Sequence, residues 1–230
     1  MRALADNPMF GIIISILAYE IGLFIYRRAK LSVFNPLLIA IVLVSVFLIL
    51  FKIDPASYDK GGELISFFLG PATVILAVPL YKQLGNLKAN IVPIIAGILA
   101  GSLTAVLSVV ACMKIFKLDT RLGLSLVPKS ITTPIGIELS RQIGGIPPVT
   151  VAAIIITGII GSVIGPFLCK VFKIEDKIAV GLALGTSAHA IGTTKAVELG
   201  ETEGAMSSLA IGIAGVFTVF LAVLLVRLLL

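Results

Sequence analysis

The chain has 230 residues, of which 58% are hydrophobic and 13% charged, and its mean hydropathy is +1.15. Because charged residues make up about a quarter of an ordinary soluble domain, this composition excludes such a domain and indicates an integral membrane protein. The net charge of +6 would suggest nucleic acid as a partner if the protein were soluble. Here the Lys and Arg residues are scattered between apolar segments, which is typical of topology signals at a membrane face. We therefore expect a lipid bilayer, and no nucleic acid, as a partner.

The apolar segments predict an all-α, polytopic membrane protein. A spanning helix needs about 20 mostly apolar residues, so there is room for about seven or eight. A single membrane domain over residues 1–230 is expected, with an N-terminal helix pair at 9–62 and a core at 63–230. The predicted segments are 9–26 and 33–52, followed by a polar link at 53–62, and then 63–81, 91–113, 121–143, 149–172, 178–199 and 205–229.

Two of the later segments carry polar groups inside apolar sequence. The stretch "PKSITTPIG" occupies residues 128–136, and "GTSAHAIGTTKA" at 185–196 contains the only histidine, His189. Pro128 and Pro134 each lack an N–H group and predict a helix break, and Pro134 is expected to push the preceding residue, Thr133, out of the helical region. In the second stretch, Gly185 and Gly192 are expected to supply the flexibility.

The regions around these stretches resemble each other. A basic link precedes each one, "KIFK" at 114–117 and "KVFK" at 170–173, and each region ends in Glu-Leu. This predicts an internal duplication of a span plus an interrupted helix, near 91–143 and 149–199, although shared membrane composition would explain part of the likeness. Interrupted or re-entrant helices in such pairs are typical of secondary transporters.

The sequence does not decide how the chain is oriented in the membrane. If the two repeats are parallel, their basic links share a side, and strict alternation then places the basic link at 27–30 on the opposite side. Both sides cannot be cytoplasmic under the positive-inside tendency. A re-entrant segment would remove the conflict.

The polar groups at the breaks suit a small carboxylate. A break leaves free N–H groups and a positive dipole end on the half-helix that follows it, which favours an anion. Ionisable groups deep in a membrane cost at least about 2.5 to 3.5 kcal/mol and are functional by default. The alternative is that the hydroxyls bond their own or neighbouring helices, contributing about 0.6 kcal/mol each. The predicted substrate-binding residues are Lys129, Ser130, Thr132, Thr133, Ser187, His189, Thr193 and Lys195.

Three ionisable groups in or after the breaks have two possible roles each. His189 is interpreted as a substrate-binding residue, and a role as proton carrier stays open. Glu138 and Glu198 follow the breaks, and each is either a salt-bridge partner, of Arg141 or Lys195, or a carboxylate that couples transport to protons.

No motif of an enzyme is present. The sequence contains no P-loop, GxGxxG, HExxH or GxSxG motif. Cys112 and Cys169 lie in apolar runs without metal-ligand spacing. We therefore predict no enzymatic activity, no cofactor and no metal site.

Six motifs follow one another over nearly the whole chain. They are "NPLL" at 35–38, "GPATVILAVPLY" at 70–81, "LVPKSITTPI" at 126–135, "GGIP" at 144–147, "GTSAHAIGTTKAVEL" at 185–199 and "EGAMSSLA" at 203–210. By these motifs the sequence resembles the LrgB family of antiholin-like membrane proteins, whose plant relatives include the plastidial glycolate/glycerate translocator.

The resemblance implies one of two functions. Bacterial members are described as modulators of murein hydrolase activity and autolysis that act with a small holin-like membrane protein. The plant branch and some bacterial members are linked to transport of small monocarboxylates such as glycolate, glycerate or pyruvate.

The polar breaks favour transport over regulation. We therefore predict a secondary transporter or facilitator of small monocarboxylates in a bacterial plasma membrane, crossing it several times and forming a homo-oligomer. The alternative is an antiholin-like or holin-like regulator of murein hydrolases and autolysis, in which the breaks serve packing.

Overall fold

The computed structural model describes residues 7–29, 34–68, 71, 81 and 84–229, and in these residues all regular secondary structure is helical. The prediction of an all-α fold is thus confirmed for this part of the chain. The chain forms two compact units, Met1–Ile75 and Leu76–Leu230, which are described separately. Within the described residues, the helices long and apolar enough to cross a membrane are α2 (Pro8–Ala29), α8 (Ile91–Ile115), α11 (Pro147–Val171) and α13 (Glu201–Leu229). The larger number of spans stays a prediction.

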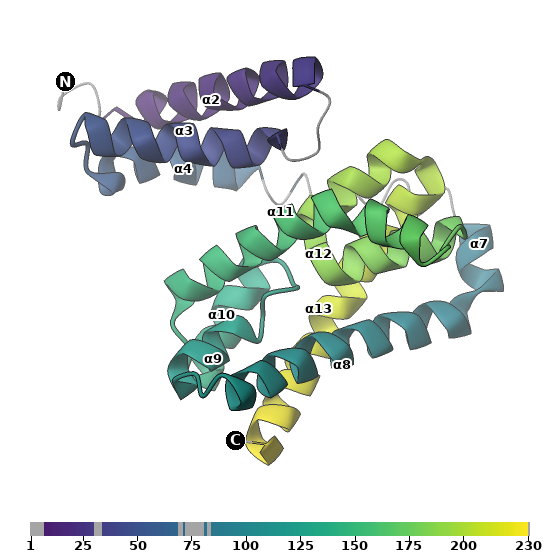
Figure 1. The fold of residues 1–230 in the computed structure, drawn as a ribbon. Coiled ribbons are helices and arrows are strands. Elements are labelled where there is room, and N and C mark those ends of the chain that lie inside the picture. Colours follow the sequence, from purple (N-terminus) through teal and green to yellow (C-terminus); the bar gives the residue numbers. More distant parts are fainter. Residues whose placement is uncertain (1–6, 30–33, 69–70, 72–80, 82–83, 230) are drawn as a thin grey trace. The chain divides into compact units, whose positions relative to one another are not determined.

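The first unit contains α2, α3 (Pro36–Leu50) and α4 (Pro55–Phe67) (Figure 1). Asn35 caps α3, because its Oδ1 accepts a hydrogen bond of 2.9 Å from the Leu37 N–H. The polar link predicted at 53–62 is instead mostly the first half of α4, because Asp54 caps that helix and Pro55 suits its first turn. Most of the segment predicted at 63–81 lies outside the described residues.

The second unit contains the remaining helices, and its core lies along α13. Met206, near the start of α13, packs with Ile94 and Ile98 of α8. Ala222, near the end of α13, packs with Val106 and Val109 of α8. The two helices therefore run in the same direction. The other helices of this unit are α7 (Leu84–Ala89), α9 (Thr120–Leu126), α10 (Thr133–Ile143) and α12 (Lys177–Leu199).

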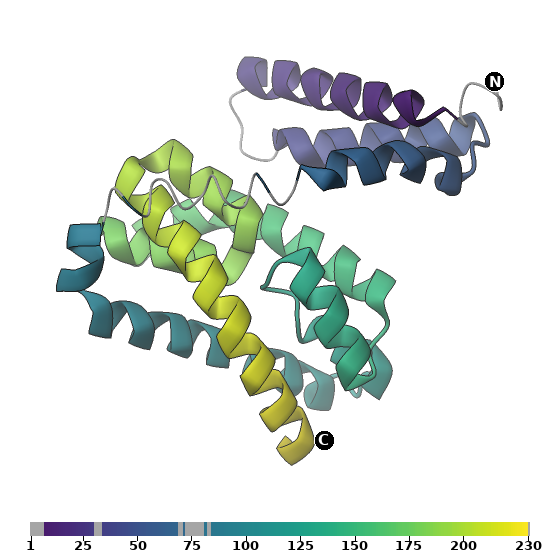
Figure 2. The same cartoon turned by 180° about the vertical axis from the view of Figure 1, so that it is seen from behind.

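Helix α11 runs antiparallel to α8, and α12 lies against both (Figures 1 and 2). Glycines of α8 meet the first half of α12 in the same order along the chain, whereas glycines of α11 meet it in reverse order. The basic links at 114–117 and 170–173 therefore lie at opposite ends of this unit. The pairs that show this order are Gly97 with Leu182, Gly101 with Thr186, Gly161 with Ala188 and Gly165 with Leu184.

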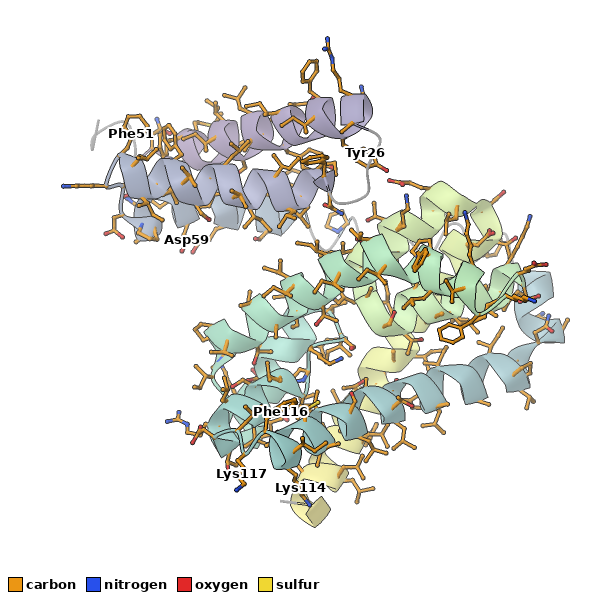
Figure 3. The ribbon with its side chains drawn as sticks, viewed as in Figure 1. Tyr26, Phe51, Asp59, Lys114, Phe116 and Lys117 are labelled. Carbon is orange, nitrogen blue, oxygen red and sulfur yellow. The ribbon has the colours of Figure 1, made fainter. Side chains whose placement is uncertain are left out.

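Helices α3, α8 and α11 all end in the same Phe-Lys turn. Lys52, Lys117 and Lys173 have φ of 51°, 50° and 54°, the left-handed conformation that commonly closes a helix. In each turn the residue after the lysine donates its N–H to a carbonyl five residues back, at 3.0 Å or less. Figure 3 labels Phe116 and Lys117 at the end of α8 and Phe51 at the end of α3. The likeness noticed between two links thus extends to a third, in the first unit.

Helix α10 folds back beside α9, and hydrogen bonds from α11 hold it there. Thr150 Oγ1 of α11 lies 2.8 Å from the carbonyl oxygen of Ser125 on α9 and 2.7 Å from Ser140 Oγ on α10. A continuous helix would separate residues 125 and 140 by about 22 Å. The chain from α9 to α10 therefore begins and ends at the end of the unit where α8 terminates.

We expect Thr150→Val to destabilise this fold. The substitution leaves the buried Ser140 hydroxyl and the Ser125 carbonyl short of a partner, which costs about 1 to 3 kcal/mol. Thermal unfolding of the purified chain in detergent should therefore show a lower melting temperature. Thr104→Val is the matched control, because the Thr104 hydroxyl bonds the Ala100 carbonyl of its own helix at an exposed position. Equal melting temperatures for the two variants would contradict a stabilising role of the Thr150 hydrogen bonds.

Candidate functional site

The second polar stretch breaks helix α12 at His189. This residue has φ 43° and ψ −136°, a conformation that costs a non-glycine residue about 1 to 3 kcal/mol. In a straight helix, residues 184 and 192 would lie about 12 Å apart. A Cβ placed on Gly192 would instead lie 3.2 Å from the carbonyl carbon of Leu184. The half of α12 after His189 therefore folds back against the first half.

Neighbouring helices hold this break in place. His189 Nε2 lies 2.9 Å from the Ile154 carbonyl oxygen of α11, which accepts its hydrogen. Thr193 Oγ1 donates to the His189 carbonyl at 3.0 Å and lies 2.7 Å from Ser207 Oγ of α13. His189 and Thr193 are both buried, so their polar groups are satisfied inside the protein.

The break lies at His189 rather than at the predicted glycines. Gly185 and Gly192 both have helical backbone. A Cβ on Gly185 would lie 2.8 Å from Ser207 Oγ, and one on Gly192 would lie 2.7 Å from the Ala188 Cβ. These glycines are needed for close packing of α13 and of the returning half-helix. Tertiary contacts, and not glycine flexibility, set the position of the break.

The first polar stretch forms a tight turn between α9 and α10. Lys129 N–H donates to the Leu126 carbonyl at 3.1 Å, and Ile131 N–H donates to the Pro128 carbonyl at 3.2 Å. The extended residue is Thr132, with ψ 147°, whereas the prediction placed Thr133 outside the helix. Thr133 begins α10 because Pro134 sits in the first turn, where its missing N–H needs no partner.

Both stretches line one cavity of about 990 Å3 between α8, α11 and α12. Lys129 and Ser130 come from the first stretch, and Thr186 and Ser187 lie in the second. The Lys129 ammonium donates a hydrogen bond of 3.2 Å to the buried Ser130 hydroxyl. Glycines and aliphatic side chains make up most of the remaining lining, together with the hydroxyls of Thr104, Ser108 and Thr157 and the polar side chains of Asn90 and Asp176.

The charges of the lining favour an anion at the end of the cavity near Lys129. Lys129 is the only lysine or arginine among the described lining residues. The one carboxylate, Asp176, lies at the start of α12, where its Oδ1 accepts the Ala179 N–H at 2.8 Å. That carboxylate is therefore engaged in capping its own helix.

Comparison with known proteins agrees with the membrane character of the chain. The model of the LrgB-like family matches residues 15–228. The chain is 42% identical over 223 residues to the antiholin-like protein LrgB of Bacillus subtilis (strain 168), covering 96% of each chain. It is also 42% identical over 214 residues to the antiholin-like protein LrgB of Bacillus cereus (strain B4264), covering 93% of each chain. The chain belongs to the LrgB family. No solved structure matches it.

Several predicted site residues of this LrgB-family chain lie away from the cavity lining. Lys195 Nζ forms an ion pair of 2.8 Å with Glu198 Oε2. Glu138 Oε2 lies 3.6 Å from Arg141 Nη1, and both side chains are exposed. Substrate contact stays a prediction for these groups and for Thr132, Thr133, His189 and Thr193, none of which is among the lining residues.

Sequence reasoning missed the other hydroxyls of the cavity. Thr104 and Ser108 of α8 and Thr157 of α11 lie in long apolar runs, where a single Ser or Thr gives no functional signal. Thr186 adjoins Ser187 in the same polar stretch, and this adjacency is the local signal that could have identified it. Among the described residues, no group of three His, Cys, Asp or Glu side chains could hold a metal ion.

We expect His189→Gly to unfold at a higher temperature than His189→Ala. Both variants lose the hydrogen bond to Ile154, but only glycine relieves the backbone strain of about 1 to 3 kcal/mol. In an ordinary helix the order is reversed, because glycine is about 1 kcal/mol less favourable than alanine. Ala183→Gly, at an exposed helical position of the same helix, is the control and should lower the melting temperature. A higher melting temperature for His189→Ala than for His189→Gly would contradict the strained break.

Proposed function

We propose that this LrgB-family chain carries small monocarboxylates, such as glycolate, glycerate or pyruvate, across a membrane as a secondary transporter or facilitator. The observation that carries the proposal is that both polar stretches contribute to one cavity, with a lysine as its only described cation. Lys129 is half-buried, and an ammonium group withdrawn from water attracts an anion more strongly than an exposed one. A cavity of about 990 Å3 leaves room for water beside so small an anion.

The directions of the helices support the same proposal. The chain from α9 to α10 starts and returns at one end of the second unit, and α12 starts and returns at the other. We interpret these as two re-entrant hairpins that enter a membrane from opposite sides, within an inverted repeat of span plus hairpin. Inverted repeats with interrupted helices at the substrate site are typical of secondary transporters. We further propose a multi-pass location in a bacterial plasma membrane and a homo-oligomer.

The inverted arrangement predicts opposite labelling of two engineered cysteines. In a chain carrying Cys112→Ala and Cys169→Ala, Thr120→Cys marks the link after α8 and Glu175→Cys marks the link after α11, both at exposed positions. We expect a membrane-impermeant maleimide to label only one of them in sealed cells and to label both after permeabilisation. The cysteine-free chain is the control. Labelling of both from the same side of intact cells would overturn the inverted repeat.

Transport itself is tested by uptake of labelled glycolate, glycerate and pyruvate into proteoliposomes. We expect saturable uptake by the wild-type chain and a loss of about tenfold or more in Lys129→Met, because a hydrogen bond to a charged group contributes about 1.5 to 3 kcal/mol. Lys114→Met removes the same charge at an exposed position at the end of α8 and should leave uptake unchanged. Uptake no greater than in empty vesicles, from folded protein, would overturn the proposal.

A second candidate function is supported by the names of the relatives. The curated relatives from Bacillus subtilis and Bacillus cereus are both named antiholin-like protein LrgB. On this alternative the chain is a membrane regulator of murein hydrolases and autolysis that acts with a small holin-like membrane protein. Lys129→Met would then leave regulation of autolysis intact in cells, whereas a transporter whose substrate controls autolysis would lose both activities together.

A further inference from the structure

Three of the six described hydroxyl groups that line the cavity already donate their hydrogen within their own helix. A Ser or Thr hydroxyl has a single hydrogen to donate, and in helices it commonly bonds a carbonyl one turn earlier. Thr104 donates to Ala100 at 2.8 Å, and Ser108 donates to Ala105 at 2.8 Å. Ser187 donates to the Ala183 carbonyl at 2.6 Å. These groups can donate to a bound anion only by giving up the bond within their own helix.

Thr186 is different from its neighbour Ser187. The residue is 7% exposed, and its Oγ1 is buried without a hydrogen-bond partner among the described residues. Its methyl group is the part that faces α8, since a Cβ placed on Gly101 would lie 2.6 Å from Thr186 Cγ2. A buried hydroxyl without a partner destabilises the folded chain. A valine of the same shape would fill the same space without that penalty.

The first stretch supplies a second available donor. Ser130 Oγ accepts the hydrogen bond from Lys129 Nζ, so the hydrogen of the Ser130 hydroxyl is free to point elsewhere. Ser130 is 5% exposed and lines the same cavity as Thr186. Each stretch therefore contributes one buried hydroxyl whose hydrogen is not committed, and the first also contributes the ammonium group.

We propose that Thr186 is the anion-binding hydroxyl of the second stretch. Its side chain turns toward the cavity, so that the buried Oγ1 donates its hydrogen to an oxygen of a small monocarboxylate that Lys129 and Ser130 also bind. The inference rests on the proposed function. It adds to the site a binding residue, Thr186, that neither the sequence analysis nor the family comparison assigns. Gly101 is required opposite Thr186, because a side chain there would displace the threonine. The bound anion supplies the acceptor that the folded chain itself lacks.

The test combines stability with binding in Thr186→Val and Thr186→Ser. The purified full-length chain is titrated in detergent with glycolate and with pyruvate by calorimetry, and its melting temperature is measured without anion. We expect Thr186→Val to melt at or above the wild-type temperature but to bind the better of the two anions at least tenfold more weakly. Thr186→Ser keeps the hydroxyl and should bind within about threefold of wild type. Thr218→Val, a buried threonine of α13 outside the cavity lining, is the matched control and should bind like wild type.

Each other outcome overturns the inference in a recognisable way. If Thr186→Val binds like wild type while Lys129→Met does not, the anion site stands and Thr186 is not part of it. If Thr186→Val loses binding together with a lower melting temperature, the hydroxyl has a structural role. If the wild-type chain binds neither anion and takes up neither, this inference falls together with the proposed function.

Discussion

The second unit depends on one constraint, that backbone polar groups inside a bilayer must find their partners within the protein. Its two polar stretches meet this constraint differently. Around Pro128 the chain uses short-range turns, in which Ile131 N–H reaches back only three residues. At His189 the backbone is held in a strained conformation by a side-chain bond to Ile154 on α11 and by Thr193 on its own helix. A break in α12 is thus stable only because α11 and α13 cover it.

Close approach of the helices makes that cover possible. Gly101 on α8 and Gly161 on α11 lie against opposite sides of the first half of α12, facing Thr186 and Ala188. Small residues allow membrane helices to pack through dispersion and hydrogen bonds, where burial of apolar surface gives no advantage over lipid. The same small residues line the cavity, so that the packing of α12 and the shape of the proposed anion site are set by the same positions.

The two candidate functions make different use of this architecture. For a carrier, the cavity and its uncommitted hydroxyls would be the working parts, with Lys129 and Thr186 both in the lining. For an antiholin-like regulator, the same strain would have to be explained by packing alone. A buried Thr186 hydroxyl without a partner among the described residues does nothing for packing, and this is the observation on which we base the proposed anion ligand. The relatives carry names that point to regulation, and transport of a small metabolite is compatible with a regulatory effect on cells.

The sequence by itself determined the membrane class, the all-α fold and the family, because these follow from composition and from motifs that are local in the chain. It also marked both polar stretches and placed Lys129 and Ser130 as candidates, since proline and charge in apolar sequence are local signals. The tertiary structure decided that the second break lies at His189 and that Thr132 is the extended residue of the first. It also decided that α10 and the second half of α12 fold back, that the basic links lie at opposite ends, and that Thr186 lines the cavity. These features depend on contacts between residues far apart in the chain, such as Ile154 with His189 or Thr150 with Ser125, which no local pattern encodes.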